Sequence, residues 1–226
     1  MIKNKNAQII YQTAYITLGL VASVASLGFF EMEFRWDFYI FFTNISNYFC
    51  IIIMLVELIQ TVKRDKDDYV TTMPFMKFCG MMGILLTLLV FNLLLAHAPG
   101  RDPAENYKVG CVLMHIVLPL MYTADWILFY DKGKVRGSYP FLSLLFPLIY
   151  QMYIYIHASI HRFDTSVLNY LGTDPLIYPY FFLNPERVGI IGVIKWCAAL
   201  MVLFAVGGFV FMGIDRLMMC IRDRAE

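Results

Sequence analysis

Long apolar stretches alternate with short polar segments along the whole chain. Each apolar stretch reaches the roughly 20 residues that a membrane-spanning helix needs, and the polar segments contain the prolines, glycines and charges that end helices. We therefore predict an all-α polytopic membrane protein, with a bundle of six transmembrane helices forming a single domain over residues 1–226. The predicted helices cover about residues 9–30, 38–59, 75–98, 109–130, 138–161 and 188–214.

The composition agrees with this pattern. Hydrophobic residues make up 60% of the chain and charged residues only 15%, whereas soluble domains are about 45–50% apolar and about 25% charged. The net charge of +1 argues against a nucleic-acid partner. The five cysteines lack the paired spacing of a disulfide scaffold or a zinc ribbon.

The first apolar stretch follows two basic residues, Lys3 and Lys5, as the apolar region of a signal peptide would. Its uncharged run is longer than the roughly 7–15 residues of that region. We therefore expect an uncleaved first helix.

The orientation follows from the Lys and Arg residues flanking the predicted helices. Twelve lie on the side of the termini and six on the other side. Because cytoplasmic loops carry the excess of basic residues, we predict that both termini are cytoplasmic.

Most polar residues inside the predicted helices fall in one layer, near the outer ends. Thr43 and His115 lie roughly 8 and 9 Å below the ends of their helices at about 1.5 Å per residue, and Asn92, Gln151 and Lys195 lie at similar depths. Polar groups in a bilayer are costly and tend to mark function. The inner half holds chiefly Asp125 together with Glu57 and Asp215, which are close enough to helix ends to snorkel.

A hydroxyl and an imidazole in this layer suggest chemistry. Thr43 shares a helix face with Asn47, because the two residues are four apart. Imidazole is the usual base that activates a hydroxyl nucleophile, and Asn47, Asn92 or Gln151 could orient it. The alternative is structural: a threonine or histidine in a membrane helix commonly bonds a backbone carbonyl or a neighbouring helix.

Two segments resemble signature regions of the androgen-induced-gene membrane hydrolases, a family of intramembrane threonine hydrolases. They are FFTNISN at residues 41–47 and MHIVLP at residues 114–119. The chain is more closely similar to a bacterial branch of six-helix membrane proteins, through these motifs, the Asp125-Trp126 pair and YPYFFLN at residues 178–184. The resemblance runs from about residue 38 to residue 192. Asn44 departs from the pattern, because the animal enzymes have an apolar residue after the threonine.

The resemblance implies that Thr43 is the nucleophile and His115 its base. It implies fatty acid esters of hydroxy fatty acids as a substrate class, and a multi-pass protein of a bacterial cytoplasmic membrane. The predicted partners are therefore membrane lipids or fatty-acyl esters, and no cofactor or metal is predicted. The proposed supporting or oxyanion residues are Asn44, Asn47, Asn92, Gln151 and Asp125, and the pocket candidates are Tyr122, Trp126, His157, Tyr180 and Lys195.

Three other interpretations remain open at this point. Cys111 lies four residues before His115, so a cysteine-dependent acyltransferase is conceivable. His157 and His161 have the spacing of two metal ligands on one helix face, with a third ligand to come from His97, His115 or Asp164. A non-enzymatic lipid binder or transporter could use Lys195 with Glu186 or Asp164. In the hydrolase interpretation, the proline-rich connection from residue 162 to residue 187 is expected to form a lid over the outer mouth of the site.

Overall fold

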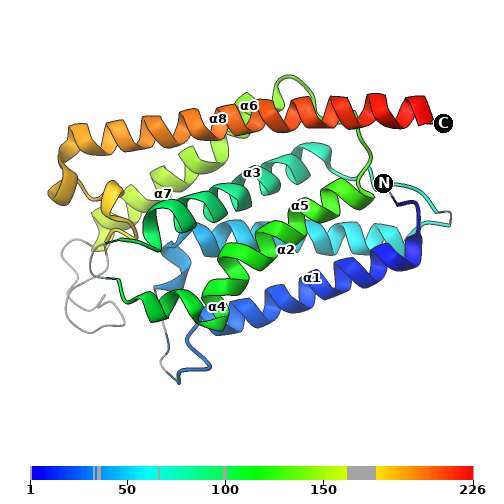
Figure 1. Cartoon of the computed structure of the whole chain (residues 1–226). Coiled ribbons are helices and arrows are strands. Elements are labelled where there is room, and N and C mark those ends of the chain that lie inside the picture. The colour runs from blue at the N-terminus through cyan, green and yellow to red at the C-terminus, as the bar shows by residue number, and fades with distance from the viewer. Residues whose placement is uncertain are drawn as a thin grey trace.

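The computed structural model of the chain describes residues 2–32, 34, 37–65, 67–98, 101–161 and 177–225. These residues form helices and connections, without a strand among them. Six of the helical rods are long and apolar enough to cross a bilayer, and Figure 1 shows them as one elongated bundle. The all-α class and the six predicted spans are therefore confirmed, and the six apolar helices indicate a multi-pass integral membrane protein.

The rods are built from continuous and interrupted helices. Three rods combine separately named helices: α3 with the π-helical turn η2, α4 with the π-helical turn η4 and α5, and α6 with α7. A fourth, α8, has a kink at Gly189, with φ 71° and ψ 160°. The helices are α1 (Lys5–Ser26), α2 (Phe42–Lys63), α3 (Pro74–Val90), η2 (Phe91–Leu95), α4 (Val109–Val112), η4 (Leu113–Val117), α5 (Leu118–Phe129), α6 (Tyr139–Leu142), α7 (Leu145–His161) and α8 (Pro185–Ala225). Three short 3-10 helices lie in the connections: η1 (Phe38–Ile40), η3 (Pro103–Tyr107) and η5 (Phe181–Leu183).

The predicted boundaries differ most for the first, second and last helices, and α2 both begins and ends four residues later than predicted. Helix α1 begins four residues early, because the side chain of Asn4 accepts a hydrogen bond from the Ala7 N–H and caps it. It ends before Gly28, which has φ 76°. Helix α8 continues well past the predicted end at residue 214, because charged residues beyond the apolar span favour water without ending a helix.

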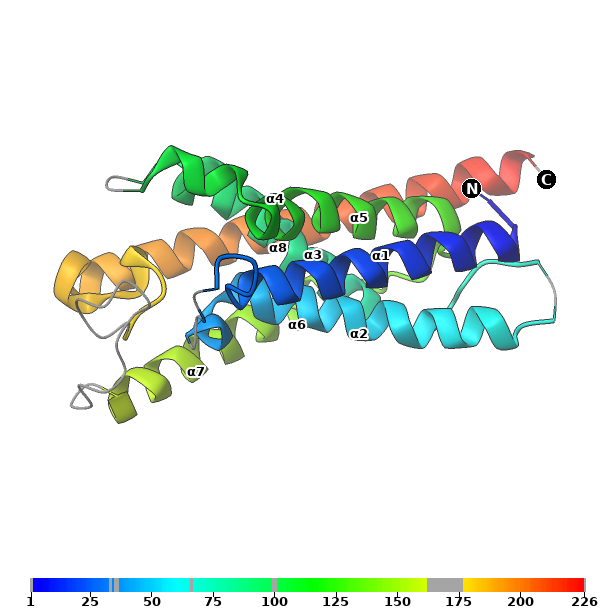
Figure 2. The ribbon, with the colours of Figure 1, turned by 90° about the horizontal axis from the view of Figure 1, so that it is seen from below.

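The core lies between α1, α2, α3, α5 and α8. Helix α1 packs against α2, α4 and α5, and α3 packs against α2, α5 and α8; α1 and α2 run side by side in Figures 1 and 2. The largest core side chains that are almost completely buried are Tyr15, Phe78, Met81, Tyr122, Trp126 and Phe204. A second cluster of buried residues joins α2, α7 and η5 and includes Ile40, Phe42, Tyr150, Ile154, Phe182 and Leu183.

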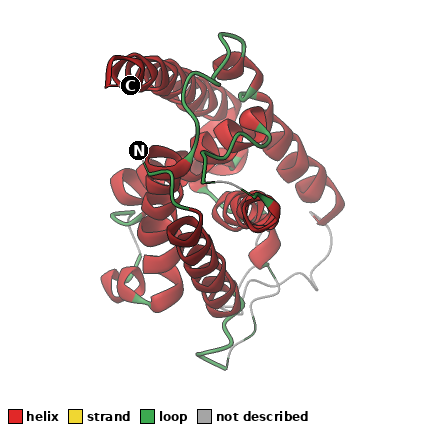
Figure 3. Ribbon diagram, turned by 90° about the vertical axis from the view of Figure 1, so that its right-hand side faces the viewer, coloured by secondary structure: helices red, strands yellow, loops and turns green. Residues whose placement is uncertain are grey.

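Both termini lie at one end of the bundle, as Figures 1 and 3 show. We call this the terminal end; it also carries residues 64–65, 67–73 and 130–138 of the connections. The opposite end carries residues 27–32, 37–41, 96–98, 101–108 and 177–184, and we call it the site end.

Two acidic residues predicted to snorkel are instead buried. Glu57 and Asp215 are 0% and 1% exposed, so this prediction is wrong. Lys77 and Lys132, counted above among the basic residues of one side, are also buried. Charged side chains in this half of the bundle therefore bind one another or backbone groups inside the protein.

Candidate active site

Thr43 and His115, predicted to form a nucleophile–base pair, are in contact. The Thr43 hydroxyl oxygen lies 3.2 Å from Nε2 of His115. Thr43 stands in the first turn of α2 and is 8% exposed, and His115 lies in the π-helical turn η4. Both residues are therefore near the site end, within hydrogen-bonding reach for proton transfer.

The hydrogen bond made by Nδ1 of His115 determines whether Nε2 can accept a proton. Nδ1 of His115 lies 2.9 Å from the backbone oxygen of Cys111. Because a carbonyl oxygen can only accept, Nδ1 carries the hydrogen, and in the neutral ring Nε2 is left to accept a proton from Thr43. The Phe91 ring stacks on the imidazole, with ring centroids 3.6 Å apart, and holds its plane.

The backbone around His115 departs from a regular α-helix because of Pro119. Proline has no N–H, so the carbonyl oxygens of Met114 and His115, five and four residues earlier, lose this helical partner. Asn47 Nδ2 lies 3.2 Å from the Met114 oxygen, and Asn92 Nδ2 lies 3.4 Å from the His115 oxygen, and each amide donates there. The π-helical turn that presents His115 is thus stabilised by side chains from two neighbouring helices, an arrangement frequent at functional sites.

The asparagines predicted to orient the imidazole or bind an oxyanion donate to backbone carbonyls instead. Besides the contacts above, Asn47 donates to the Thr43 carbonyl at 2.8 Å and Asn92 to the Leu88 carbonyl at 2.7 Å. Asn44 donates to the Phe38 carbonyl at 2.5 Å. Their amide groups shape the main chain around the pair, and the Cys111 carbonyl orients His115.

Tyr180, a predicted pocket residue, reaches the start of α2. Its hydroxyl accepts a hydrogen bond from the Phe42 N–H at 3.1 Å. Burial raises the pKa of this phenol, although hydrogen bonds with Thr43 and Phe42 oppose the rise. The tyrosine therefore remains protonated and can donate a hydrogen bond beside Thr43.

Two cavities meet at Thr43. The larger, of about 330 Å³, lies at the site end; besides Thr43 and His115 its lining contains charged residues, namely Glu31, Asp37, Arg101, Glu105, Lys108 and Arg187. The smaller, of about 70 Å³, is lined mainly by apolar residues from α3, α7 and α8. Four residues line both: Thr43, Phe91, Leu95 and Tyr180. The hydroxyl thus stands between a polar and an apolar compartment.

Several predicted site residues lie elsewhere. Asp125 contacts Lys77 rather than His115, and Lys195 is exposed on α8. His157 Nε2 is 3.3 Å from the Tyr39 hydroxyl, outside both cavities. Tyr122 and Trp126 also line neither cavity.

Gln151, predicted to orient His115 or bind an oxyanion, lies closer to the candidate site than these residues. It lines the smaller cavity, and its amide nitrogen is 3.0 Å from Cys197 Sγ. Because this cavity adjoins Thr43, Gln151 is a wall residue of the candidate site rather than an orienting partner of His115.

The metal and lid predictions depend on residues that the structure describes only in part. The His157 and His161 rings lie 4.5 Å apart, but within the described ranges no three His, Cys, Asp or Glu residues are grouped as metal ligands. Asp164 and most of the predicted lid, residues 162–176, lie outside the described residues. The described remainder of that connection borders the site, because residues 179–181 line the larger cavity and residues 182–183 the smaller.

Comparison of the chain with protein-family models, curated proteins and solved structures finds no match. The functional interpretation therefore depends on the residues themselves and on the geometry that they adopt.

Proposed function

We propose that the protein is an intramembrane lipid-ester hydrolase in which Thr43 is the nucleophile and His115 the general base. The observation that carries the proposal is the 3.2 Å contact between the Thr43 hydroxyl and an Nε2 that is free to accept a proton. The motifs around both residues, similar to those of intramembrane threonine hydrolases, support the same roles. Turnover of a fluorogenic fatty-acyl ester by the purified protein, compared with its Thr43 and His115 variants, tests the proposal.

In the first half of the reaction, the Thr43 oxygen attacks the ester carbonyl carbon while its proton passes to Nε2 of His115. The carbon–oxygen bond to the alcohol then breaks, and the alcohol leaves with the proton from His115. In the second half, water attacks the acyl–threonine ester, again giving a proton to His115. The fatty acid is released as the proton returns to Thr43, so the enzyme is regenerated.

The negative charge that develops on the carbonyl oxygen needs hydrogen-bond donors. The amide donors of Asn44 and Asn47 are bound to backbone carbonyls, so they are poorly placed for this role. The Tyr180 hydroxyl lies at the start of α2 beside Thr43, where it accepts from the Phe42 N–H and keeps its own hydrogen to donate. The positive end of the helix dipole of α2 also favours an anion there. We assign oxyanion stabilisation to these groups.

The two cavities favour an amphiphilic substrate. The carboxyl end of an acyl chain would enter the apolar cavity, whose volume of about 70 Å³ holds only its first carbons. The polar remainder of the ester would lie in the compartment lined by Arg101, Lys108 and Arg187. The ester bond would then lie at Thr43, where the cavities join. This supports a membrane lipid or fatty-acyl ester as substrate, with fatty acid esters of hydroxy fatty acids as the first class to assay.

A cysteine-dependent acyltransferase is the second candidate, because Cys111 Sγ lies 3.5 Å from Nδ1 of His115. That nitrogen already donates to the Cys111 carbonyl at 2.9 Å, so it has no lone pair with which to take the thiol proton. Thr43 faces the nitrogen that does. The geometry therefore favours Thr43 over Cys111 as the nucleophile.

We place the site end outside and both termini in the cytoplasm of a bacterial cell, from the excess of basic residues at the terminal end. In a variant whose native cysteines are replaced, we expect an impermeant thiol reagent to label Asp102→Cys in intact cells. Asp65→Cys, at the terminal end, should be labelled only after the cells are permeabilised. Both aspartates are exposed, so the reverse pattern would contradict the orientation rather than report burial.

Hydrolysis should not need a metal ion, because the hydroxyl, the imidazole and the oxyanion donors complete the acyl transfer. We expect ester turnover to survive dialysis against a chelator, with elemental analysis showing no stoichiometric metal. Loss of turnover that zinc or iron restores would contradict this and direct attention to His157 and His161.

A further inference from the structure

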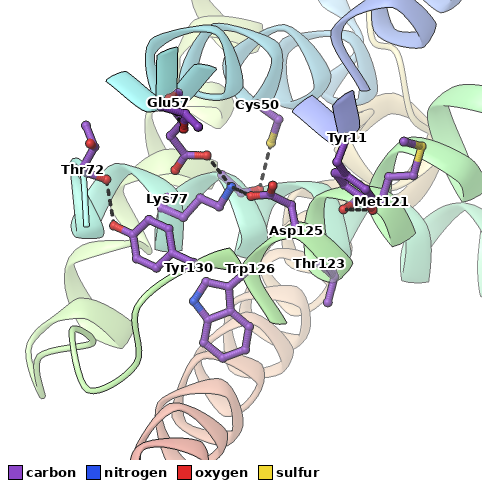
Figure 4. A network of polar contacts seen from close by, with 12 residues as sticks. Tyr11, Cys50, Glu57, Thr72, Lys77, Met121, Thr123, Asp125, Trp126 and Tyr130 are labelled. Atoms are coloured by element: carbon purple, nitrogen blue, oxygen red, sulfur yellow. Dashed lines mark hydrogen bonds and ion pairs between the residues drawn. The ribbon is translucent and has the colours of Figure 1, made fainter. Parts of the chain in front are cut away.

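One buried ammonium contacts two carboxyl groups inside the bundle, remote from the Thr43–His115 pair. The Lys77 ammonium donates to Glu57 Oε2 at 2.8 Å and to Asp125 Oδ2 at 2.7 Å, as Figure 4 shows. The three side chains are at most 1% exposed. We call this group the buried triad.

The buried triad joins the helices that build the candidate active site. Glu57 lies on α2, which carries Thr43, and Lys77 on α3, which continues into the turn containing Phe91. Asp125 lies on α5, which continues the turn containing His115. On α2, fourteen residues separate Thr43 from Glu57, or about 21 Å at 1.5 Å per residue. The triad thus ties together, toward the terminal end, the same three rods that meet at the site.

The charges of the buried triad do not balance if both carboxyl groups are ionised. One ammonium and two carboxylates leave one negative charge, and an unbalanced charge in a membrane interior is costly. The ammonium also makes cation–π contacts with the rings of Tyr122 and Tyr130, whose centroids lie 4.1 and 5.8 Å away. These contacts stabilise the cation and do not compensate the carboxylates.

Among the described residues, Lys132 is the cation that could relieve this excess, and it does not. Lys132 interacts electrostatically with Asp125, and although burial lowers its pKa to about 8, it remains a cation near neutral pH. However, Lys132 also faces the Asp215 carboxylate, so including both residues leaves the sum at minus one. The other titratable groups around the triad, all neutral near pH 7, are Tyr11, Tyr15, Cys50, Tyr122 and Tyr130.

Within the part of the chain that the structure describes, the second oxygen of each carboxyl group has no partner. Glu57 Oε1 and Asp125 Oδ1 are buried and have no hydrogen-bond partner among the described residues. A carboxylate oxygen in this position loses its hydration without compensation, whereas a protonated carboxyl group carries no charge to be solvated.

We infer that the buried triad is a proton-binding site, in which Glu57 and Asp125 together hold one proton beside the Lys77 ammonium. The bound proton makes the cluster electrically neutral and belongs to the carboxyl pair. It resides chiefly on Glu57, because Asp125 also faces Lys132. Release of the proton leaves an excess negative charge between α2 and α5, so the protonation state acts on the helices that carry Thr43 and His115.

Infrared spectroscopy of the full chain in lipid nanodiscs tests this, because a protonated carboxyl group has its own carbonyl band. Near neutral pH the wild-type protein should show such a band, and Glu57→Gln should remove it. Asp125→Asn should also remove it, since one ionised carboxylate then balances Lys77. In Lys77→Gln the band should grow, because both carboxyl groups take up protons.

Asp68→Asn is the control, since it removes an exposed carboxyl group in the connection between α2 and α3, outside the triad, and should leave the triad's band in place. Glu57→Gln should also keep the thermal stability of the wild type, because the amide resembles the protonated acid. An unchanged carboxyl region in folded Glu57→Gln or Asp125→Asn would mean that both groups are ionised, and would overturn the inference. The readout does not involve ester turnover, so it is independent of the proposed hydrolase function.

Discussion

Replacing Thr43 or His115 with alanine should lower kcat/KM for a fatty-acyl ester by about 10³-fold or more. Thr43→Ala removes the attacking oxygen, and His115→Ala removes the imidazole placed to take its proton. Because the two residues act as a unit, the double variant should be no slower than either single one. Ester turnover by purified, delipidated protein measures the effect.

Two controls separate this loss from misfolding. Thr43→Ser keeps a hydroxyl at the same place and should retain measurable turnover. Thr123→Ala removes a threonine of α5 whose hydroxyl donates to the Pro119 carbonyl of its own helix, and should be nearly neutral. Near-full activity in Thr43→Ala would show that another residue attacks, and Cys111 or Ser46 would be tested next.

Lys77→Met should be the most destabilising single substitution that we predict. It leaves Glu57 and Asp125 buried without their cation, and breaking a buried charge pair costs about 3–5 kcal/mol of unfolding free energy. Lys134→Met is the matched control, because Lys134 pairs with Asp131 at 3.0 Å but is 44% exposed, and such pairs contribute about 0–1 kcal/mol. Reversible unfolding in mixed micelles measures both variants.

Equal effects of Lys77→Met and Lys134→Met would contradict a structural role for the buried triad. A large loss of unfolding free energy in Lys77→Met and a small one in Glu57→Gln would support that structural role, since the glutamine amide oxygen still accepts from the Lys77 ammonium.

The hydrophobic pattern predicted the six spans because membrane helices are specified by length and polarity alone. The Thr43–His115 contact was also predictable, since both residues lie at the same depth from the same end of the bundle. The depth of a residue along its helix does not say, however, whether its side chain points into the bundle or outward. Lys195 lies at that depth as well, but it is exposed on the surface of α8, where a long side chain can snorkel to the interface.

The buried triad and the asparagine contacts could not be predicted in this way. From their positions near helix ends in the sequence, Glu57 and Lys77 would be expected to reach water. The packing of α2, α3 and α5 instead brings them together with Asp125. Asn47 and Asn92 are committed to carbonyl groups that Pro119 leaves without a helical partner. Pro119 in the sequence predicts that these carbonyl groups lack a helical partner. Which side chains of neighbouring helices donate to them depends on the tertiary structure.

Trapping the acyl-enzyme tests the central claim most directly. The purified protein is treated with a fluorophosphonate or a slowly hydrolysed activated ester, digested, and analysed by peptide mass spectrometry. We expect an adduct on Thr43 that is absent in Thr43→Ala and greatly reduced in His115→Ala, while Cys111→Ala leaves it unchanged. An adduct on Cys111, or turnover of the ester without any adduct on Thr43, would contradict a threonine nucleophile.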